Sequence, residues 1–256
     1  MPNVTQDWPT ADTAAQIAAN VTAVRDRIAA AAHRVGRDPA EVRLLPVSKT
    51  VPEERLRAAA AAGLHELGEN KVQEADRKQA ALRDLGIRWS LIGHLQRNKA
   101  REVAAFAAEF QALDSLRIAA TLDRRLAAVD RTLPVFVQVN TSAEPQKYGI
   151  APEELTDFLT ALRPYDRLEV RGLMTLAVFS ADADRVRPCF TLLRTLRDRV
   201  RETDPDLLGP GELSMGMSGD FETAVEEGAT VVRVGQAIFG ARQTPDSHYW
   251  PGASHD

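Results

Sequence analysis

Short apolar runs alternate with stretches of helical periodicity along most of the chain. The first stretch, residues 10–35, predicts a helix that precedes the repeat, because apolar residues recur at helical spacing at Ile17, Val21, Val24 and Ile28. Eight short apolar runs follow, each with helical sequence after it. We interpret these runs as strands over Val42–Val47, Leu64–Leu67, Trp89–Ile92, Phe110–Leu113, Val135–Val139, Val170–Met174, Leu213–Met217 and Val231–Val234.

This alternation predicts parallel strands joined by crossover helices. Eight strand–helix units after one helix fit a single (β/α)8 TIM barrel of the α/β class, with an extra N-terminal helix. A doubly wound open sheet is the alternative, because sequence patterns rarely separate closed from open parallel sheets. We expect the barrel, with its first helix, to cover residues 1–243, and residues 244–256 to form a flexible tail.

Four helix starts carry local signals. Asp114 and Ser115 can cap the helix that begins near Leu116, and Pro152–Glu154 places acidic residues in a first turn. Thr50–Glu53 matches a capping box, with Pro52 just inside the helix that follows. Ser218 precedes a helical pattern and predicts another capped start.

Composition narrows the function classes. The 256 residues carry 32 basic and 36 acidic side chains, a net charge of −4, so the chain lacks the basic excess that nucleic-acid binding needs. The longest apolar runs are too short to cross a membrane. Cys189 is the one cysteine, which fits a reducing compartment, so we expect a cytoplasmic protein. We expect no metal, because His33, His65, His248 and His255 show no ligand spacing and no second cysteine supports zinc.

Lysine is rare in this chain, which draws attention to Lys49. Five of the 32 basic residues are lysines, and Lys49 follows the first predicted strand. Alternation along that strand puts Leu45, Val47 and Lys49 on one face, so Lys49 would point inward at the C-terminal end of the barrel, where barrel active sites lie. There its amine could form a Schiff base with an aldehyde. The alternative is a lysine at a strand end whose ammonium reaches solvent.

Arg233 is the second unusual residue. In the last strand it shares a face with Val231 and Gly235, which predicts a guanidinium inside a barrel filled by apolar layers. That position is costly unless the guanidinium meets an acceptor. A buried ion pair with a barrel carboxylate is the alternative to a ligand.

Glycine-rich loops follow the last two strands. Residues 214–219 and 235–240 contain them, and barrels often bind phosphate on these two loops. Gly235 lets backbone N–H groups approach an anion, and Ser218 adds a hydroxyl. An amine, a phosphate site and a buried arginine together suit pyridoxal 5′-phosphate (PLP). Turns that only serve chain geometry are the alternative.

These motifs resemble the pyridoxal 5′-phosphate homeostasis protein family, single-domain relatives of the fold-type III alanine racemase barrel. The resemblance rests on an ordered set of segments: residues 44–50, 67–74, 89–99, 137–140, 171–174, 213–218 and 232–242.

The resemblance implies a role for each site residue. Lys49 would carry PLP as a Schiff base, the internal aldimine, and Arg233 would lie near the pyridine nitrogen. The phosphate would be bound by Ser218, Gly235 and Gln236. Gln236 stands where the family usually has threonine, so backbone contacts are expected there. Three further cofactor-binding residues are expected: Asn70 and His94 lining the pocket, and Met217 packed against the ring or a helix.

The family points to a carrier or regulator in PLP homeostasis with little or no turnover, and to PLP-dependent apoenzymes as partners. We expect a monomer. The alternative is a racemase-like enzyme acting on small amino acids, which needs a tyrosine as second base. Tyr148 is the one tyrosine at the predicted mouth of the barrel. A barrel that uses no PLP would leave Lys49 and Arg233 unexplained.

A basic stretch in the second and third helices of the repeat is expected to be a solvated face. A surface that meets apoenzymes is the second interpretation. The stretch consists of Lys71, Lys78, Arg97, Lys99 and Arg101.

Overall fold

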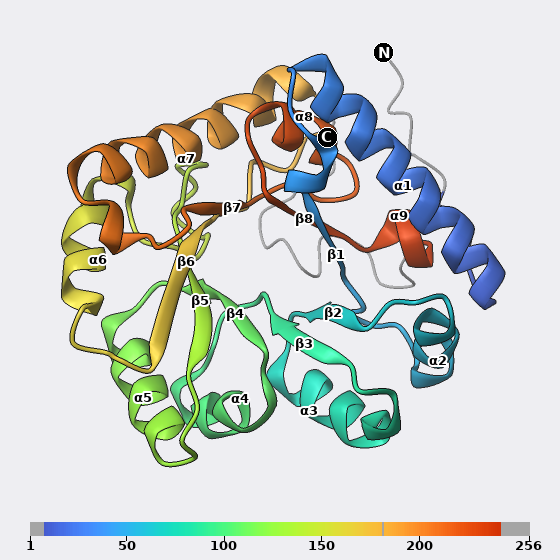
Figure 1. Ribbon diagram of the computed structural model, residues 1–256, viewed down its shortest axis with the longest axis horizontal. Coiled ribbons are helices and arrows are strands. Elements are labelled where there is room, and N and C mark those ends of the chain that lie inside the picture. The colour runs from blue at the N-terminus through green and yellow to red at the C-terminus, as the bar shows by residue number, and fades with distance from the viewer. Residues whose placement is uncertain (1–7, 181, 242–256) are drawn as a thin grey trace.

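The computed structural model describes residues 8–180 and 182–241 (Figure 1). Its strands are β1 (Arg43–Pro46), β2 (Glu66–Glu69), β3 (Arg88–Leu91), β4 (Glu109–Leu113), β5 (Leu133–Gln138), β6 (Leu168–Met174), β7 (Glu212–Ser214) and β8 (Val231–Val234). Its α-helices are α1 (Ala14–Arg34), α2 (Glu53–Ala61), α3 (Val72–Ala81), α4 (Ala100–Phe106), α5 (Leu116–Ala127), α6 (Leu155–Leu162), α7 (Ala183–Thr203), α8 (Phe221–Glu226) and α9 (Gln236–Phe239). Short 3-10 helices connect some of them: η1 (Pro39–Glu41), η2 (Arg83–Leu85), η3 (Arg97–Lys99), η4 (Pro152–Glu154) and η5 (Pro205–Leu207).

The strands close into a ring. Within the described ranges, eight parallel strands pair in the order β1-β8-β7-β6-β5-β4-β3-β2. A parallel bridge between Val47 and Gly68 then joins the two ends of that order. The predicted barrel is confirmed, and the open doubly wound sheet is wrong.

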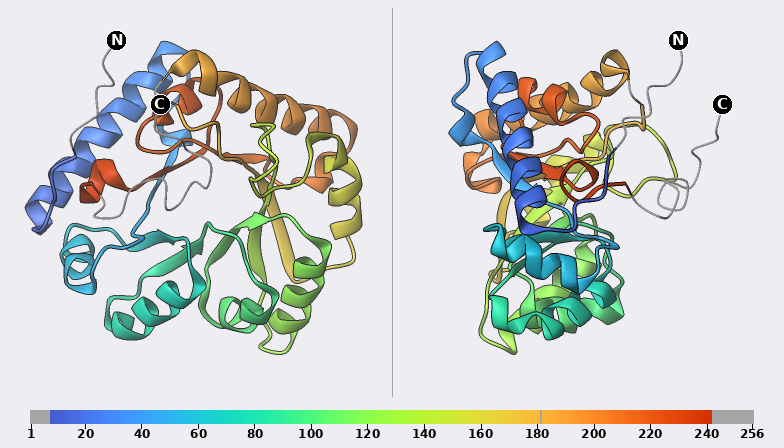
Figure 2. Two further views of the ribbon diagram at one scale, coloured as in Figure 1. Left: turned by 180° about the vertical axis from the view of Figure 1, so that it is seen from behind. Right: turned by 90° about the vertical axis from the view of Figure 1, so that its right-hand side faces the viewer.

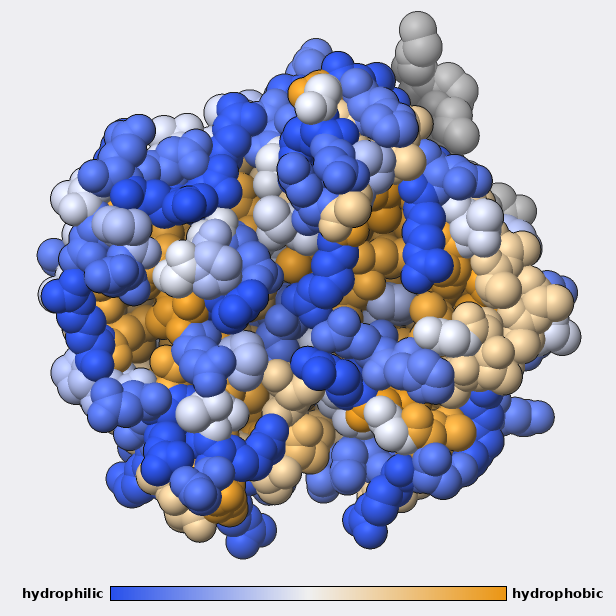
Figure 3. All heavy atoms as spheres, viewed as in Figure 1, coloured by the Kyte–Doolittle hydropathy of each residue, from blue (hydrophilic) through white to orange (hydrophobic). Residues whose placement is uncertain are grey.

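Helices surround the ring on its outside (Figures 1 and 2). The extra helix α1 packs against α2, α8 and α9, and its predicted apolar stripe is buried. It begins with a capping box: the Thr13 hydroxyl accepts from Gln16 N–H at 3.3 Å, and Gln16 Oε1 accepts from Thr13 N–H at 3.1 Å. Polar side chains cover most of the face in Figure 3, with apolar ones chiefly in the hollows between them. Residues 8–180 and 182–241 include no helix with the length and hydropathy of a membrane span.

Each predicted strand is present, but some ends moved. β8 has the predicted bounds, whereas β7 ends at Ser214, three residues before the predicted Met217. Gly216 has a φ of +92°, and its Cα lies against α8, where a Cβ would be 2.6 Å from Ala224. Its carbonyl still accepts from Arg233 N–H at 2.9 Å, so backbone contact with β8 continues past the end of β7.

Ser115 occupies the N-cap position of α5, as expected, but two other predicted caps are wrong. Pro52 is the N-cap of α2 and makes no side-chain cap, while Thr50 has a φ of +66° and lies in the turn after β1. Asp220, rather than Ser218, is the N-cap of α8. The N–H of Thr50 and the hydroxyl of Ser218 instead bond to groups in neighbouring strand–helix units, and local sequence cannot show such contacts.

Candidate functional site

The ends of β1 and β8 lie side by side and bring three predicted site residues together. Lys49 lies three residues after β1 and is half-buried. Arg233 of β8 is in register with Leu45 of β1. The loop after β8 comes close to β1 as well, because a Cβ on Gly235 would lie 3.0 Å from the Val47 carbonyl oxygen. Lys49, Arg233 and Gly235 therefore belong to neighbouring strand ends at the C-terminal mouth of the barrel.

Arg233 is held inside the barrel by uncharged acceptors. Its side chain is almost wholly buried, at 3% exposure. Nη1 donates to the Ser214 hydroxyl at 2.7 Å and Nη2 donates to the Thr175 carbonyl at 2.8 Å. Burial lowers the pKa of Arg233 to about 10, and the nearby charge of Asp220 opposes that shift. The ion-pair alternative expected a carboxylate bonded directly to Arg233, whereas its bonded acceptors are a hydroxyl and a backbone carbonyl.

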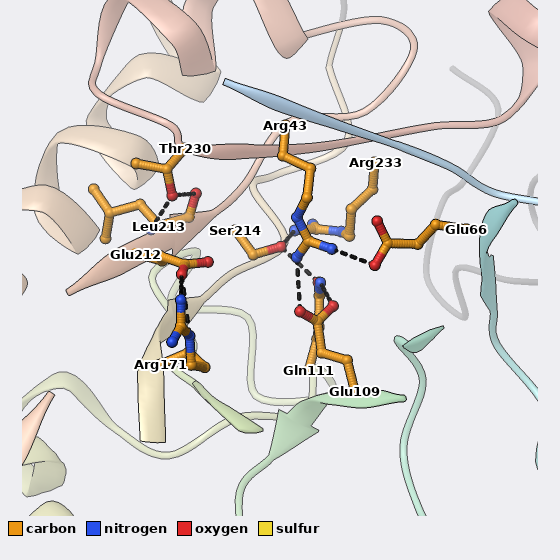
Figure 4. Close-up of polar contacts among 10 residues, drawn as sticks. All are labelled: Arg43, Glu66, Glu109, Gln111, Arg171, Glu212, Leu213, Ser214, Thr230 and Arg233. Carbon is orange, nitrogen blue, oxygen red and sulfur yellow. Dashed lines mark hydrogen bonds and ion pairs between the residues drawn. The ribbon is translucent and has the colours of Figure 1, made fainter. Parts of the chain in front are cut away.

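The acceptors of Arg233 continue across the barrel interior (Figure 4). The Ser214 hydroxyl donates to Gln111 Oε1 at 2.6 Å, and Gln111 Nε2 donates to Glu109 Oε1 at 2.5 Å. Ser214 and Gln111 are fully buried. A chain of hydrogen bonds therefore fixes the direction in which the Arg233 guanidinium is held.

An ion-pair network forms the other end of this chain. Arg43 Nη2 donates to Glu109 Oε2 at 2.7 Å, and Arg43 Nη1 donates to Glu66 Oε1 at 2.8 Å. Both carboxylates raise the pKa of Arg43 against its burial. The expectation of purely apolar layers inside the barrel is therefore wrong: strands β1, β2, β4, β7 and β8 contribute polar side chains that point toward one another (Figure 4).

Ser218 joins the two glycine-rich loops. Its hydroxyl oxygen accepts from the backbone N–H groups of Gly235 and Ala237, both at 3.3 Å, and its side chain is buried. Met217 beside it is half-buried, and its N–H donates to Asp220 Oδ1 at 2.5 Å. Gln236 is half-buried and lines a groove shared with Trp8 and residues of α1.

Gly93 brings Asn70 and His94 together. A Cβ on Gly93 would lie 2.2 Å from the Asn70 backbone oxygen and 2.7 Å from Asn70 Oδ1, so only glycine fits. His94 follows directly. The chain after β3 thus passes against the chain after β2, and both residues lie at the mouth.

His94 forms an aromatic stack with Tyr148. Their ring centroids are 4.0 Å apart with an interplanar angle of 11°. His94 Nδ1 lies 3.7 Å from Asp114 Oδ2, and the same oxygen accepts from Gly149 N–H at 3.3 Å. Burial raises the pKa of Asp114, against the charge of His94 and the hydrogen bond from Gly149. The loops after β3, β4 and β5 meet at this point.

The expected solvated basic face is wrong at Lys78. Its side chain is fully buried, while Lys71, Arg97 and Arg101 are exposed. Lys78 Nζ lies 2.7 Å from Glu69 Oε1 and 2.7 Å from Glu74 Oε1. The spacing of the buried residues of α3 could have found it, because Val72, Ala75 and Lys78 recur every three residues.

The closed ring of parallel strands, with polar groups at the mouth, defines a TIM-like α/β barrel protein. The family model "Alanine racemase, N-terminal domain" matches residues 16–243. Among curated proteins, the "Pyridoxal phosphate homeostasis protein" of Pseudomonas aeruginosa is 45% identical over 227 residues, which cover 88% of this chain and 96% of the relative. The protein of the same description from Escherichia coli K12 is 40% identical over 233 residues, covering 88% and 97%. The chain belongs to the pyridoxal phosphate homeostasis protein family, as its motifs predicted.

Solved structures agree. The PipY protein of Synechococcus elongatus, in a structure described as having PLP bound, superposes with a TM-score of 0.77 at 36% identity, covering 88% of this chain and all of that one. Alanine racemase of Clostridium difficile superposes with a TM-score of 0.65 at 14% identity, over 95% of this chain and 60% of the racemase, and shows the fold alone.

Proposed function

We propose that this chain binds PLP as a Schiff base on Lys49 and acts in intracellular PLP homeostasis as a carrier or regulator with little or no turnover. Support comes from the family's description and from a relative of 36% identity whose structure is described as having PLP bound. The observation that carries the proposal is Arg233: a buried guanidinium, bound directly by neutral acceptors, one strand away from the segment that bears Lys49.

Lys49 would supply the covalent bond. As a neutral amine, its Nζ could condense with the aldehyde of PLP: a C=N bond would replace the C=O bond, and the oxygen would leave as water with the two protons of the nitrogen. The neutral amine is the form that would attack.

Arg233 would face the pyridine nitrogen. A guanidinium has only donors, so it can donate to an unprotonated ring nitrogen but cannot accept a proton from a protonated one. An unprotonated ring is a weak electron sink, which would disfavour aggressive carbanion chemistry.

The phosphate would lie against the loops after β7 and β8. Ser218 and the N–H groups of Gly235 and Ala237 lie together there, and the contacts of Ser218 at 3.3 Å are long for hydrogen bonds. These N–H groups can therefore exchange the hydroxyl for a phosphate oxygen. At Gln236 the backbone N–H would make the contact, since this residue lines the groove toward α1.

The remaining pocket residues would be Asn70, His94 and Met217. All three are in the segments that follow strands β2, β3 and β7. We propose further that PLP-dependent apoenzymes receive the cofactor, and that the carrier is a cytoplasmic monomer.

A racemase-like enzyme acting on small amino acids is the second candidate. It is favoured by Tyr148, which stacks on His94 where a second base would be needed. Tyr148 is 58% exposed, however, and a base works best in a site that excludes water.

Absorbance spectra with and without PLP, followed by borohydride reduction and peptide mapping, test the first proposal. We expect a visible band and the mass of the reduced cofactor on the peptide that contains Lys49. Lys49→Ala should lose the band and stay folded, with a free energy of unfolding within about 0.5 kcal/mol of the unmodified protein.

Lys71→Ala is the matched control, because Lys71 is exposed, and it should keep the band. Label on Lys71 or Lys147 instead of Lys49 contradicts the proposal. Substantial turnover of free alanine or serine from L to D would instead support the racemase.

A further inference from the structure

We propose that Lys78 is a positioning residue for Lys49: its buried ammonium group holds the peptide bonds on both sides of Lys49. The role of Lys49 itself rests on the proposed function, whereas the bonds made by Lys78 are independent of it.

The ammonium group of Lys78 has all three N–H groups directed at acceptors. Nζ donates to the Ser48 carbonyl at 2.8 Å, to Glu69 Oε1 at 2.7 Å and to Glu74 Oε1 at 2.7 Å. The side chains of Lys78 and Glu69 have no solvent exposure. A buried charge in this geometry is fixed, because any rotation would leave a donor without a partner.

These contacts reach the backbone on either side of Lys49. The Ser48 carbonyl belongs to the peptide bond that precedes Lys49 and binds Nζ directly. Thr50 N–H belongs to the peptide bond that follows Lys49, and it donates to Glu74 Oε1 at 2.7 Å, the oxygen that also binds Lys78. Both peptide bonds of Lys49 are thus tied to one ammonium group.

A third contact holds the residue before Lys49. The Ser48 hydroxyl donates to Glu69 Oε1 at 2.7 Å, so this carboxylate accepts from Ser48 and Lys78 at one oxygen. Its other oxygen, Oε2, is buried and has no hydrogen-bond partner among the described residues. Without the charge of Lys78, Glu69 would have only Ser48 to offset its burial.

The turn that Lys78 holds is strained. Thr50 has a φ of +66°, in the left-handed region that β-branched residues avoid. Such a conformation persists where surrounding contacts impose it, and it occurs often at functional sites. Two contacts hold this conformation here: Thr50 N–H donates to Glu74, and Val51 N–H donates to the Ser48 carbonyl, the acceptor of Lys78, at 2.9 Å. The strained residue directly follows Lys49.

Amide hydrogen exchange on the protein without PLP, and the rate of borohydride-trapped labelling of Lys49 with PLP, test this role. In Lys78→Met, we expect hydrogen exchange at Thr50 N–H to be faster by about tenfold or more. We expect labelling of Lys49 to be slower by about tenfold or more. Gln73→Ala, an exposed change in the same helix, is the control and should leave both rates unaltered.

A second pair of variants covers the case in which Lys78→Met does not fold. Glu74→Gln keeps an oxygen that can accept from Thr50 and Lys78, so it should retain protection and labelling, whereas Glu74→Ala should lose both. The proposal is overturned if Lys78→Met folds, or Glu74→Ala is made, and the variant keeps the exchange and labelling rates of the unmodified protein. Label on another lysine in the unmodified protein would contradict the proposed function, while the exchange data would still decide the role of Lys78.

Discussion

Gly93 is a residue at the mouth where adding a single methyl group should lower the stability of the fold. The backbone after β3 approaches Asn70 so closely that a Cβ would collide with a backbone oxygen, which cannot move as a flexible side chain could. The glycine is therefore a condition for the close approach of the chain that leads to His94 and the chain at Asn70.

Gly93→Ala is expected to destabilise the fold by about 1–3 kcal/mol, because the two loops must separate to admit the methyl group. Urea unfolding measures this change. Gly219→Ala is the matched control: Gly219 is also in a loop at the mouth, but a Cβ there meets nothing within 4 Å. Equal losses in the two variants would contradict the steric argument.

Lys78 shows where sequence reasoning failed at the residue scale. A lysine in a helix is usually solvated, and the charge pattern around it favoured that interpretation. Its acceptors come from residues 48, 69 and 74. The last two lie in the same β2–α3 unit as Lys78, whereas Ser48 is brought near by the pairing of β1 with β2. Arg233 was predictable, in contrast, because strand alternation alone places it inside the barrel.

At the scale of elements, α1 depends on its own N-terminal residues. Thr13 and Gln16 bind each other's backbone groups at its start. The helix packs against α8, which follows the first glycine-rich loop, and α9, which lies within the second. Stability at this helix start is therefore a local property.

Thr13→Ala is expected to lower the free energy of unfolding by about 1 kcal/mol, since it removes the acceptor for Gln16 N–H. Thermal unfolding of the protein without PLP is the measurement. Thr22→Ala serves as control, because Thr22 is exposed in the middle of the same helix and bonds only back to Ala18. A loss as large at Thr22 as at Thr13 would rule out the cap as the cause.

The existence of the strands was predicted well, whereas the caps of two helices, α2 and α8, were predicted wrongly. Apolar runs of a few residues reflect burial on both faces of a parallel sheet, which is a property of the segment itself. The hydroxyl of Ser218 and the N–H of Thr50 instead bind partners on neighbouring units, so their local capping signals were misleading.

At the scale of the whole molecule, a series of side-chain hydrogen bonds and ion pairs from Glu66 to Arg233 crosses the barrel interior. Arg43 and Glu109 occupy the middle of this chain, and their pair connects β1 to β4 through the barrel rather than along the sheet. Removing one partner leaves a charge with reduced compensation, whereas removing both need not.

Glu109→Leu should therefore cost about 3 kcal/mol, and adding Arg43→Met should recover part of that loss. Chemical unfolding of the four proteins of the double-mutant cycle measures the coupling. Arg57 and Asp84 form an exposed ion pair and provide the control cycle, for which a much smaller coupling is expected. Additive losses at Arg43 and Glu109 would show that the pair does not connect the barrel.

The sequence by itself determined the repeat of eight strand–helix units, the inward position of Arg233 and the family, because each of these depends on residue order and periodicity along one segment. Tertiary structure alone decided that the ring closes, that the barrel interior is polar, and that Lys78 holds both peptide bonds of Lys49. These features depend on atoms from strands distant in sequence coming within hydrogen-bond range, and no local pattern records that distance.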